Sequence, residues 1–437
     1  MLRIRDFTDY DRTDYSDLLP RAPFDVAKAM EAVRDVCDGV KNDGIEALRH
    51  YSAQFDQVIP DHFKVPLSVL EDARRHLDPD VEKAIALAIE RRRTVCEQVE
   101  KEQMSRSVHL DQTAMVTNRL VPVQRVGLYV PGGLAPLASS VVMNAVPALV
   151  AGVSSLALSS PPQAQYGGYP HPVIMATCHM LGIEEVYAVG GAQAIAMFAH
   201  GVKGLCPKAD LVTGPGNIYV VAAKRYLRGQ IGIDSEAGPT EIAIIADETA
   251  NPAYLAADLI SQAEHDPLAG AVLITDSFAI AQATNEQITS QLEALDTRER
   301  LKISLTGEQS GIIVTRDLNQ SIQVANDYAA EHLEICTRNA AEVSHSIINA
   351  GAIFIGHYSP VPLGDYCAGS THVLPTSGAA KYSSGLTVRS FMRSIHVIDY
   401  SAEALCSIGQ PIIDFAHAEY LPGHAAAISV RTQGDRS

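Results

Sequence analysis

The sequence of 437 residues is poor in basic side chains: it has 34 Lys and Arg against 51 Asp and Glu, for a formal net charge of −17. Proteins that bind nucleic acid or anionic membranes by bulk electrostatics need clusters of Lys and Arg. The composition therefore favours small molecules as partners, and we expect neither nucleic acid nor a membrane.

Paired cysteines are also missing. The seven cysteines are odd in number and contain no C-x-x-C pair, which argues against a disulfide framework and against a cysteine zinc site. The acidic N-terminus, MLRIRDFTDYDRTDYSDLLP, lacks an apolar stretch followed by small residues, so it does not resemble a secretory signal. We expect a cytoplasmic protein.

No Asp, Glu, Lys or Arg occurs between Arg125 and Glu184. Prolines and glycines interrupt this segment too often to leave about 20 continuous apolar residues, the length that a membrane span requires. Parallel strands that are buried on both faces explain an uncharged segment better. The segment is thus predicted to form a buried α/β core.

Short apolar strands alternate with helical segments along most of the chain, for example VGLYVPGG before SSVVMNAVPALVAGV and EVYAVGG before AQAIAMFAHG. This alternation is typical of βαβ units and predicts an α/β protein with two consecutive parallel-sheet domains. We divide the chain into a helical lead-in that reaches the start of the first α/β half, two α/β domains and a tail. The respective ranges are 1–120, 121–237, 238–375 and 376–437.

Glycines follow three predicted strands, at 129–133, 189–194 and 213–217. Where a parallel strand ends and a helix begins, glycines allow backbone N–H groups to approach a phosphate. None of the three fits G-x-G-x-x-G, so any Rossmann-like fold is incomplete, and each could be a simple tight turn. Together they point to a nucleotide site in the first half.

Candidate metal ligands are scattered over the second half. Gln262 and His265 are three residues apart on a predicted helix that follows Asn251-Pro252, so they share one helix face. The pair is either a set of metal ligands or an ordinary polar helix end. A loop contains Asp365 and His372, and the tail contains further His and Glu residues. Nitrogen and oxygen donors of this kind suit a zinc-class metal. The spacing alone does not bring them together.

The stretch YAAEHLEI places Glu331 beside His332 within an apolar run. A solvated helix face is the ordinary interpretation of such a pair. A carboxylate next to an imidazole also suits acid–base chemistry, because neutral imidazole accepts a proton near neutral pH.

Nine blocks in order closely resemble the histidinol dehydrogenase family, from about residue 20 to the end. They are VGLYVPGG, SSVVMNAVPALVAGV, VYAVGGAQAIAMFA, TGPGNIYVVAAKR, GID followed by AGPTEIAIIAD, DLISQAEHDP, YAAEHLEI, LGDYCAGSTHVLPT and SSGLTV. The resemblance implies a four-electron oxidation of L-histidinol to L-histidine through L-histidinaldehyde, with NAD as oxidant, at the end of histidine biosynthesis. It also implies a homodimer with shared active sites, in which the C-terminal extension reaches the partner.

The resemblance assigns roles to residues of this chain. It implies one zinc ion per subunit and acid–base roles for Glu331 and His332. The implied zinc ligands are Gln262, His265, Asp365 and His424. The implied NAD contacts are Tyr129, Gln193 and Asn217. The implied substrate contacts are Thr240, Gln262, His265, His332, Asp365, His372, Glu419 and His424, of which Glu419 and His424 would complete the partner's site.

Two positions depart from the family pattern: Thr240 stands where many members have serine, and Thr371 where many have asparagine. Because neither change removes a ligand or a base, they concern substrate preference, and oxidation of another small hydroxy compound is the first alternative. A second alternative function is aldehyde oxidation through a thiohemiacetal formed on Cys336 or Cys367. A third is a zinc- or nucleotide-binding protein without catalysis.

Overall fold

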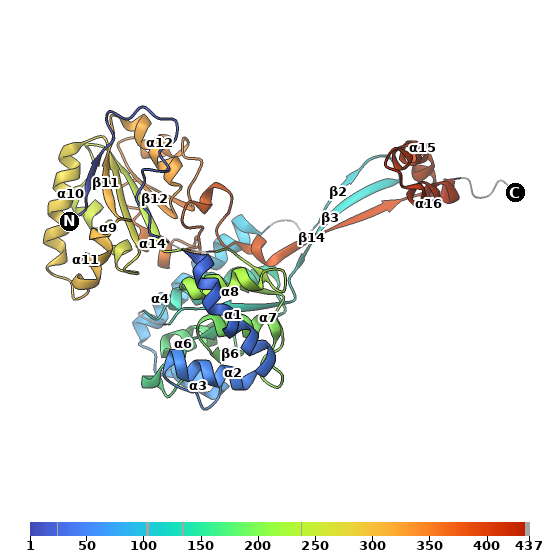
Figure 1. Ribbon diagram of the computed structural model, residues 1–437, viewed down its shortest axis with the longest axis horizontal. Coiled ribbons are helices and arrows are strands. Elements are labelled where there is room, and N and C mark those ends of the chain that lie inside the picture. Colours follow the sequence, from blue (N-terminus) through green and yellow to red (C-terminus); the bar gives the residue numbers. More distant parts are fainter. Residues whose placement is uncertain (24, 102–104, 133–134, 237, 433–437) are drawn as a thin grey trace.

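The computed structural model describes residues 1–23, 25–101, 105–132, 135–236 and 238–432. Two α/β bodies lie next to each other, and a narrow arm projects from them and ends in a pair of helices near the C-terminus (Figure 1). No helix in these described ranges is long and apolar enough to cross a membrane.

The first body contains a five-stranded parallel sheet in the order β6-β5-β4-β7-β8. Its strands are β4 (Arg125–Tyr129), β5 (Ser155–Ser160), β6 (Val186–Ala188), β7 (Leu211–Thr213) and β8 (Gly232–Ile233). Its helices are α5 (Ala138–Ala151), α6 (Pro172–Met180), α7 (Gly191–His200) and α8 (Ile218–Leu227), with the short η3 (Ala164–Tyr166). The uncharged segment forms β4, α5, β5 and α6, which are largely buried, so the predicted buried α/β core is confirmed.

N-terminal helices cover this body. They are α1 (Val26–Asp43), α2 (Ile45–Tyr51), η1 (Ser52–Asp56), α3 (Leu67–Arg75), α4 (Pro79–Val95) and η2 (Cys96–Glu100). Helix α1 packs on α7 and α8, α3 packs on α6, and α4 packs on α5. Buried Val33 and Val40 lie on one side of α1, at a spacing of seven residues that keeps both on the face toward the core.

The second body contains a six-stranded parallel sheet in the order β1-β11-β10-β9-β12-β13. Its strands are β1 (Ile4–Asp6), β9 (Glu241–Ala246), β10 (Gly270–Thr275), β11 (Gly311–Val314), β12 (His332–Cys336) and β13 (Ala352–Ile355). Its helices are α9 (Pro252–Ala263), α10 (Phe278–Leu292), α11 (Arg298–Thr306), α12 (Leu318–Tyr328), α13 (Ala340–Ser344) and α14 (Val361–Tyr366). Helix α9 begins as predicted, with the Asn251 side chain accepting from the Ala253 N–H and Pro252 in the first turn.

The arm is a three-stranded antiparallel sheet, β14-β3-β2, made of β2 (Ser105–His109), β3 (Ala114–Pro122) and β14 (Met392–Tyr400). Helices α15 (Ala402–Ala418) and α16 (Pro422–Thr432) pack against each other at its far end (Figure 1). Two short helices, η4 (Ala379–Lys381) and η5 (Val388–Phe391), precede β14.

The predicted α/β class with two parallel sheets is confirmed, whereas the antiparallel arm was not anticipated. The helical lead-in is also more than a lead-in, because β1 joins the edge of the second sheet and β3 continues past residue 120. The division at residues 120, 237 and 375 stays a prediction.

Candidate active site

The site lies at the amino ends of the central strands of the second sheet. Glu241 begins β9 and His332 begins β12, and the two strands pair side by side with His332 opposite Ile242. Helix α9 packs on β9 and brings Gln262, near its C-terminal end, to the same edge. Ligand sites of open α/β sheets usually lie at the carboxyl ends of strands, so this placement is unusual.

A chain of hydrogen bonds joins three predicted site residues. The Gln262 Nε2 group donates to the Thr240 hydroxyl, which donates its own proton to Glu331 Oε2. The backbone N–H of Glu241 donates to the same Glu331 oxygen at 3.0 Å. Since the hydroxyl has a single proton, this order fixes the Gln262 amide with its nitrogen toward Thr240.

The arrangement leaves Gln262 Oε1 buried and without a hydrogen-bond partner among the residues described. A buried, unpaired carbonyl oxygen costs about 1–3 kcal/mol of folding free energy, so such an atom calls for a ligand. An amide oxygen bound to a cation would meet that need.

His265, Asp365 and His372 form the other side of the site. Asp365 lies in α14, which packs on α9, and its Oδ2 is 3.7 Å from His265 Nε2. His372 follows in the next loop, with its Nδ1 atom 3.1 Å from the Asp365 carbonyl oxygen and its Nε2 atom 3.1 Å from Ser140 Oγ. The hydroxyl of Thr371 accepts a hydrogen bond from the Val373 N–H, which fixes the loop around His372.

Burial sets the protonation of the proposed acid–base pair. It raises the pKa of Glu331 well above the usual range of a carboxyl group, against hydrogen bonds from Thr240 and Glu241 that lower it. Burial also lowers the pKa of His332 to about 4, against the Asp365 charge that raises it. His332 is therefore neutral near pH 7. Its Nδ1 atom lies 3.6 Å from Glu331 Oε2 and has no hydrogen-bond partner within the described ranges.

The pKa of Asp365 shifts in the opposite direction from the pKa of Glu331. Burial raises the pKa of this carboxyl, but the hydrogen bond with His265 and the neighbouring His372 outweigh it, so the pKa is lowered overall. Asp365 is therefore an anion at neutral pH and a natural cation ligand.

Three of the four predicted metal ligands thus converge: Gln262, His265 and Asp365. Their amide, imidazole and carboxylate donors, together with the unpaired Gln262 oxygen, fit a zinc-class cation. His424 does not join them, because it lies in α16 at the far end of the arm, and Glu419 ends α15 nearby (Figure 1). Within the described part of one chain, no group of three or more His, Cys, Asp or Glu residues could hold a metal ion.

The predicted NAD contacts lie at the carboxyl edge of the first sheet. Tyr129 ends β4, and its hydroxyl accepts from the Gly191 N–H at 3.1 Å; Asn217 caps α8 by accepting from two N–H groups of the first turn. The chain goes from β4 to β5 and β6 on one side, then crosses to β7 on the other. The point between β4 and β7 is where open α/β sheets bind nucleotides. Gly133 of the first glycine junction lies outside the described residues.

Two residues near these sites were missed by sequence reasoning. Asp56, at the end of η1, lies against the second glycine turn with Oδ2 3.4 Å from Gln193 Nε2, and burial raises its pKa to about 7. Ser140, in the first turn of α5, meets His372. Neither position carries a local signal, because each contact joins segments far apart in the sequence.

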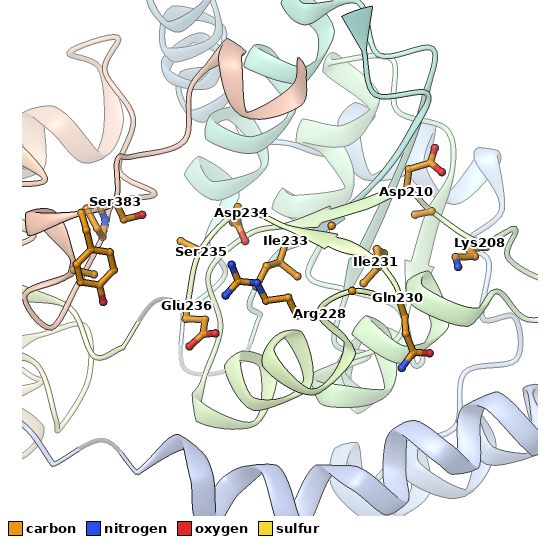
Figure 2. A pocket seen from close by; sticks show the side chains of 16 residues that line it. Lys208, Asp210, Arg228, Gln230, Ile231, Ile233, Asp234, Ser235, Glu236 and Ser383 are labelled. Carbon is orange, nitrogen blue, oxygen red and sulfur yellow. The ribbon is translucent and has the colours of Figure 1, made fainter. Parts of the chain in front are cut away.

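A cavity of about 700 Å³ lies elsewhere, along the edge strand β8 and the segment near Tyr382 (Figure 2). Its lining includes Arg228, Asp234 and Glu236, and none of the predicted site residues is among the described residues that line it. The buried Gln262 Oε1 and His332 Nδ1 atoms, which have no hydrogen-bond partner among the described residues, lie instead near β9 and β12.

Comparison with known proteins gives concordant matches. A protein-family model described as histidinol dehydrogenase matches residues 19–432. A histidinol dehydrogenase of Cutibacterium acnes is 59% identical over 436 residues, which cover 99% of each chain, and one of Thermobifida fusca is 55% identical over 413 residues, 94% of each. The crystal structure of histidinol dehydrogenase from Elizabethkingia anophelis superposes with a TM-score of 0.91 at 31% identity, covering 100% of this chain and 99% of that one.

Proposed function

The chain belongs to the histidinol dehydrogenase family, and we propose from this premise that it oxidises L-histidinol to L-histidine through L-histidinaldehyde, reducing two NAD⁺. It is accordingly an NAD-dependent oxidoreductase of histidine biosynthesis. The observation that supports the chemistry best is the buried pair of Glu331 and neutral His332 beside the unpaired oxygen of Gln262.

In the alcohol step, His332 takes the proton of the substrate hydroxyl while hydride leaves the carbon that carries this hydroxyl and passes to NAD⁺. The lowered pKa keeps the imidazole in the neutral form that can accept a proton. The carboxyl of Glu331, whose Oε2 is 3.6 Å from His332 Nδ1, and the anionic Asp365 stabilise the imidazolium that results. The products of this step are the aldehyde and one NADH.

In the aldehyde step, Glu331 takes a proton from water as the water oxygen adds to the carbonyl carbon. Burial raises the pKa of Glu331, and the hydrogen bonds from Thr240 and the Glu241 N–H oppose that shift by favouring the ionised form, which is the form that can accept a proton. Hydride then leaves the resulting hydrate anion for a second NAD⁺ as the carboxylic acid forms, and Glu331 releases to solvent the proton that it took. The hydrogen bonds from Thr240 and the Glu241 N–H hold the Glu331 carboxyl toward the site.

Zinc, one ion per subunit, would be held by Gln262, His265 and Asp365, with His424 of the partner subunit as the fourth ligand. When bound, the ion supplies a positive charge that orients the substrate nitrogens and oxygen. The subunit also supplies substrate contacts at Thr240, His332 and His372, and Glu419 of the partner subunit completes them. NAD would bind at Tyr129, Gln193 and Asn217, in a Rossmann-like but incomplete first domain.

The arm supports a homodimer with shared active sites. It carries the predicted residues Glu419 and His424 away from the site of their own chain (Figure 1). Large apolar side chains at its end are exposed, with Phe415 at 69% and Tyr420 at 91%. An exposed apolar surface of this kind favours docking against another protein, and a second copy would receive the two residues.

The test is NADH formation from L-histidinol by the purified protein, before and after chelation and zinc restoration. We expect about two NADH per histidine formed, lost on chelation and regained with zinc. One NADH with released aldehyde, or turnover only on another hydroxy compound, would contradict the four-electron reaction on histidinol.

A further inference from the structure

A buried ion pair lies beneath the third glycine junction, TGPGN. Lys224 is in α8 and Asp234 follows β8; their Nζ and Oδ1 atoms are 2.7 Å apart, and the side chains are only 3% and 4% exposed. Figure 2 shows Asp234 in the segment that leads away from β8. The roles described above for the acid–base, metal and cofactor residues do not use this pair.

Both charges also hold the backbone of Gly214. The Lys224 ammonium donates to the Gly214 carbonyl oxygen, and the Gly214 N–H donates to Asp234 Oδ2 at 2.8 Å. Each member of the pair therefore binds one of the two polar backbone groups of the same residue. Hydrogen bonds to charged groups are among the stronger ones, so this backbone position is firmly fixed.

Gly214 needs such support because its conformation is unusual. Its φ is +117°, and a Cβ atom there would lie 1.9 Å from the carbonyl oxygen of Tyr129. The residue thus brings the turn after β7 against the end of β4, at the point where the chain crosses from one side of the sheet to the other. Three residues later, Asn217 caps α8.

Stability alone does not explain two buried charges. Replacing a buried ion pair with apolar residues of similar size is often neutral or stabilising, because burial of the charges costs more than their attraction returns. The neighbouring pair of Arg225 and Glu236 is much more exposed, at 40% and 25%. What distinguishes the buried pair is that its charged groups hydrogen-bond to both polar backbone groups of Gly214.

We propose that Lys224 and Asp234 are positioning residues for the dinucleotide cofactor. By fixing Gly214, they hold the turn so that Asn217 and the first N–H groups of α8 face the cofactor. This inference rests on the proposed function for the assignment of NAD to Asn217.

The test replaces both residues of the ion pair in one variant, Lys224→Met with Asp234→Leu. This variant removes both hydrogen bonds to Gly214 without leaving one charge buried alone. NADH affinity is measured by fluorescence titration without histidinol, and the KM values for NAD⁺ and histidinol are measured separately. We expect NADH affinity to fall, and KM for NAD⁺ to rise, by about tenfold or more. The KM for histidinol and the zinc content should stay close to those of the unchanged protein, and a cooperative thermal transition shows that the variant is folded.

The matched control is Arg225→Ala with Glu236→Ala, which removes the adjacent exposed pair and should leave NADH affinity within about twofold. Unchanged NADH affinity in the Lys224/Asp234 variant would overturn the proposal. If that variant does not fold, the near-isosteric Asp234→Asn decides by the same titration. Absence of histidinol turnover in the unchanged protein would contradict the proposed function instead, and the titration separates the two because it needs no substrate.

Discussion

Ser140 and His372 meet where the two α/β bodies join, with Ser140 Oγ 3.1 Å from His372 Nε2. Ser140 lies in the first turn of α5, after β4 of the first sheet, whereas His372 follows Asp365 of the proposed metal site. The contact therefore ties the proposed cofactor edge of one sheet to the proposed substrate site of the other.

Ser140→Ala should loosen this connection. Without its hydroxyl partner, the His372 ring is held from one side only, and we expect KM for histidinol to rise about three- to tenfold while KM for NAD⁺ changes little. Ser139→Ala, at the preceding position, is the control. Steady-state kinetics with each substrate varied in turn measures both effects, and equal KM values in the Ser140 variant and the unchanged protein would show that the contact does not orient His372.

Most of both sheets could be predicted from the sequence because buried parallel strands leave a local mark: short apolar runs, helices between them and a long segment without charge. Strand β1 leaves no such mark, since three residues are too few for periodicity and its partner β11 lies about 300 residues later. The arm was missed for a similar reason, because β3 pairs with β14 across roughly 270 residues.

The site could be predicted only in parts. Helical spacing placed Gln262 and His265 on one helix face, but α9 ends at Ala263 and His265 lies in the segment after it. Gln262 contacts Glu331 through Thr240, and His265 lies against Asp365. The contact of Asp365 with His265 depends on the packing of α14 on α9, which no local spacing encodes. The rule for strand carboxyl ends fits the cofactor residues but not His332, which begins its strand.

Substitution of His332 tests the first oxidation. His332→Asn keeps a polar side chain of similar size but cannot accept the hydroxyl proton, so we expect kcat from histidinol to fall by about a hundredfold or more. Zinc content and thermal midpoint should be unchanged. Turnover at the original rate would remove His332 from the mechanism.

Substitution of Glu331 tests the second oxidation. Glu331→Gln preserves the shape that accepts from Thr240 and the Glu241 N–H but removes the base, so oxidation of added histidinaldehyde should slow about a hundredfold. Hydride transfer from histidinol should be less affected, and single-turnover NADH traces for each substrate separate the steps. Equal losses in both would contradict this division of roles.

A covalent route through cysteine is tested by Cys336→Ala and Cys367→Ala. Cys336 lies at the opposite end of β12 from His332, roughly 13 Å along the strand, and burial raises the pKa of its thiol, which disfavours the reactive thiolate. We expect each variant to keep most of its activity. A fall in kcat of about a thousandfold in either one would support a thiohemiacetal intermediate.

Asp258 and Glu334 make the stability of the second body depend on pH. Asp258 is on α9 one turn before Gln262, and its carboxyl lies close enough to that of Glu334 on β12 for each to affect the pKa of the other. Burial raises the pKa of Asp258 to about 6 and that of Glu334 well above its usual range. In the folded protein Asp258 therefore keeps a proton that the unfolded chain loses above about pH 4. Its contribution to the free energy of unfolding is fully present below pH 4 and is lost as the pH rises through about 6.

Asp258→Asn should remove much of that dependence, because the amide that replaces the carboxyl never ionises. We expect thermal midpoints close to the unchanged protein at pH 5 and higher by about 2 °C or more at pH 8, measured by calorimetry. Glu286→Gln, which neutralises an exposed carboxylate on α10, is the control and should show no such rise. If the Asp258 variant gained no stability at pH 8 relative to pH 5, the pair would not be sharing a proton in the folded protein.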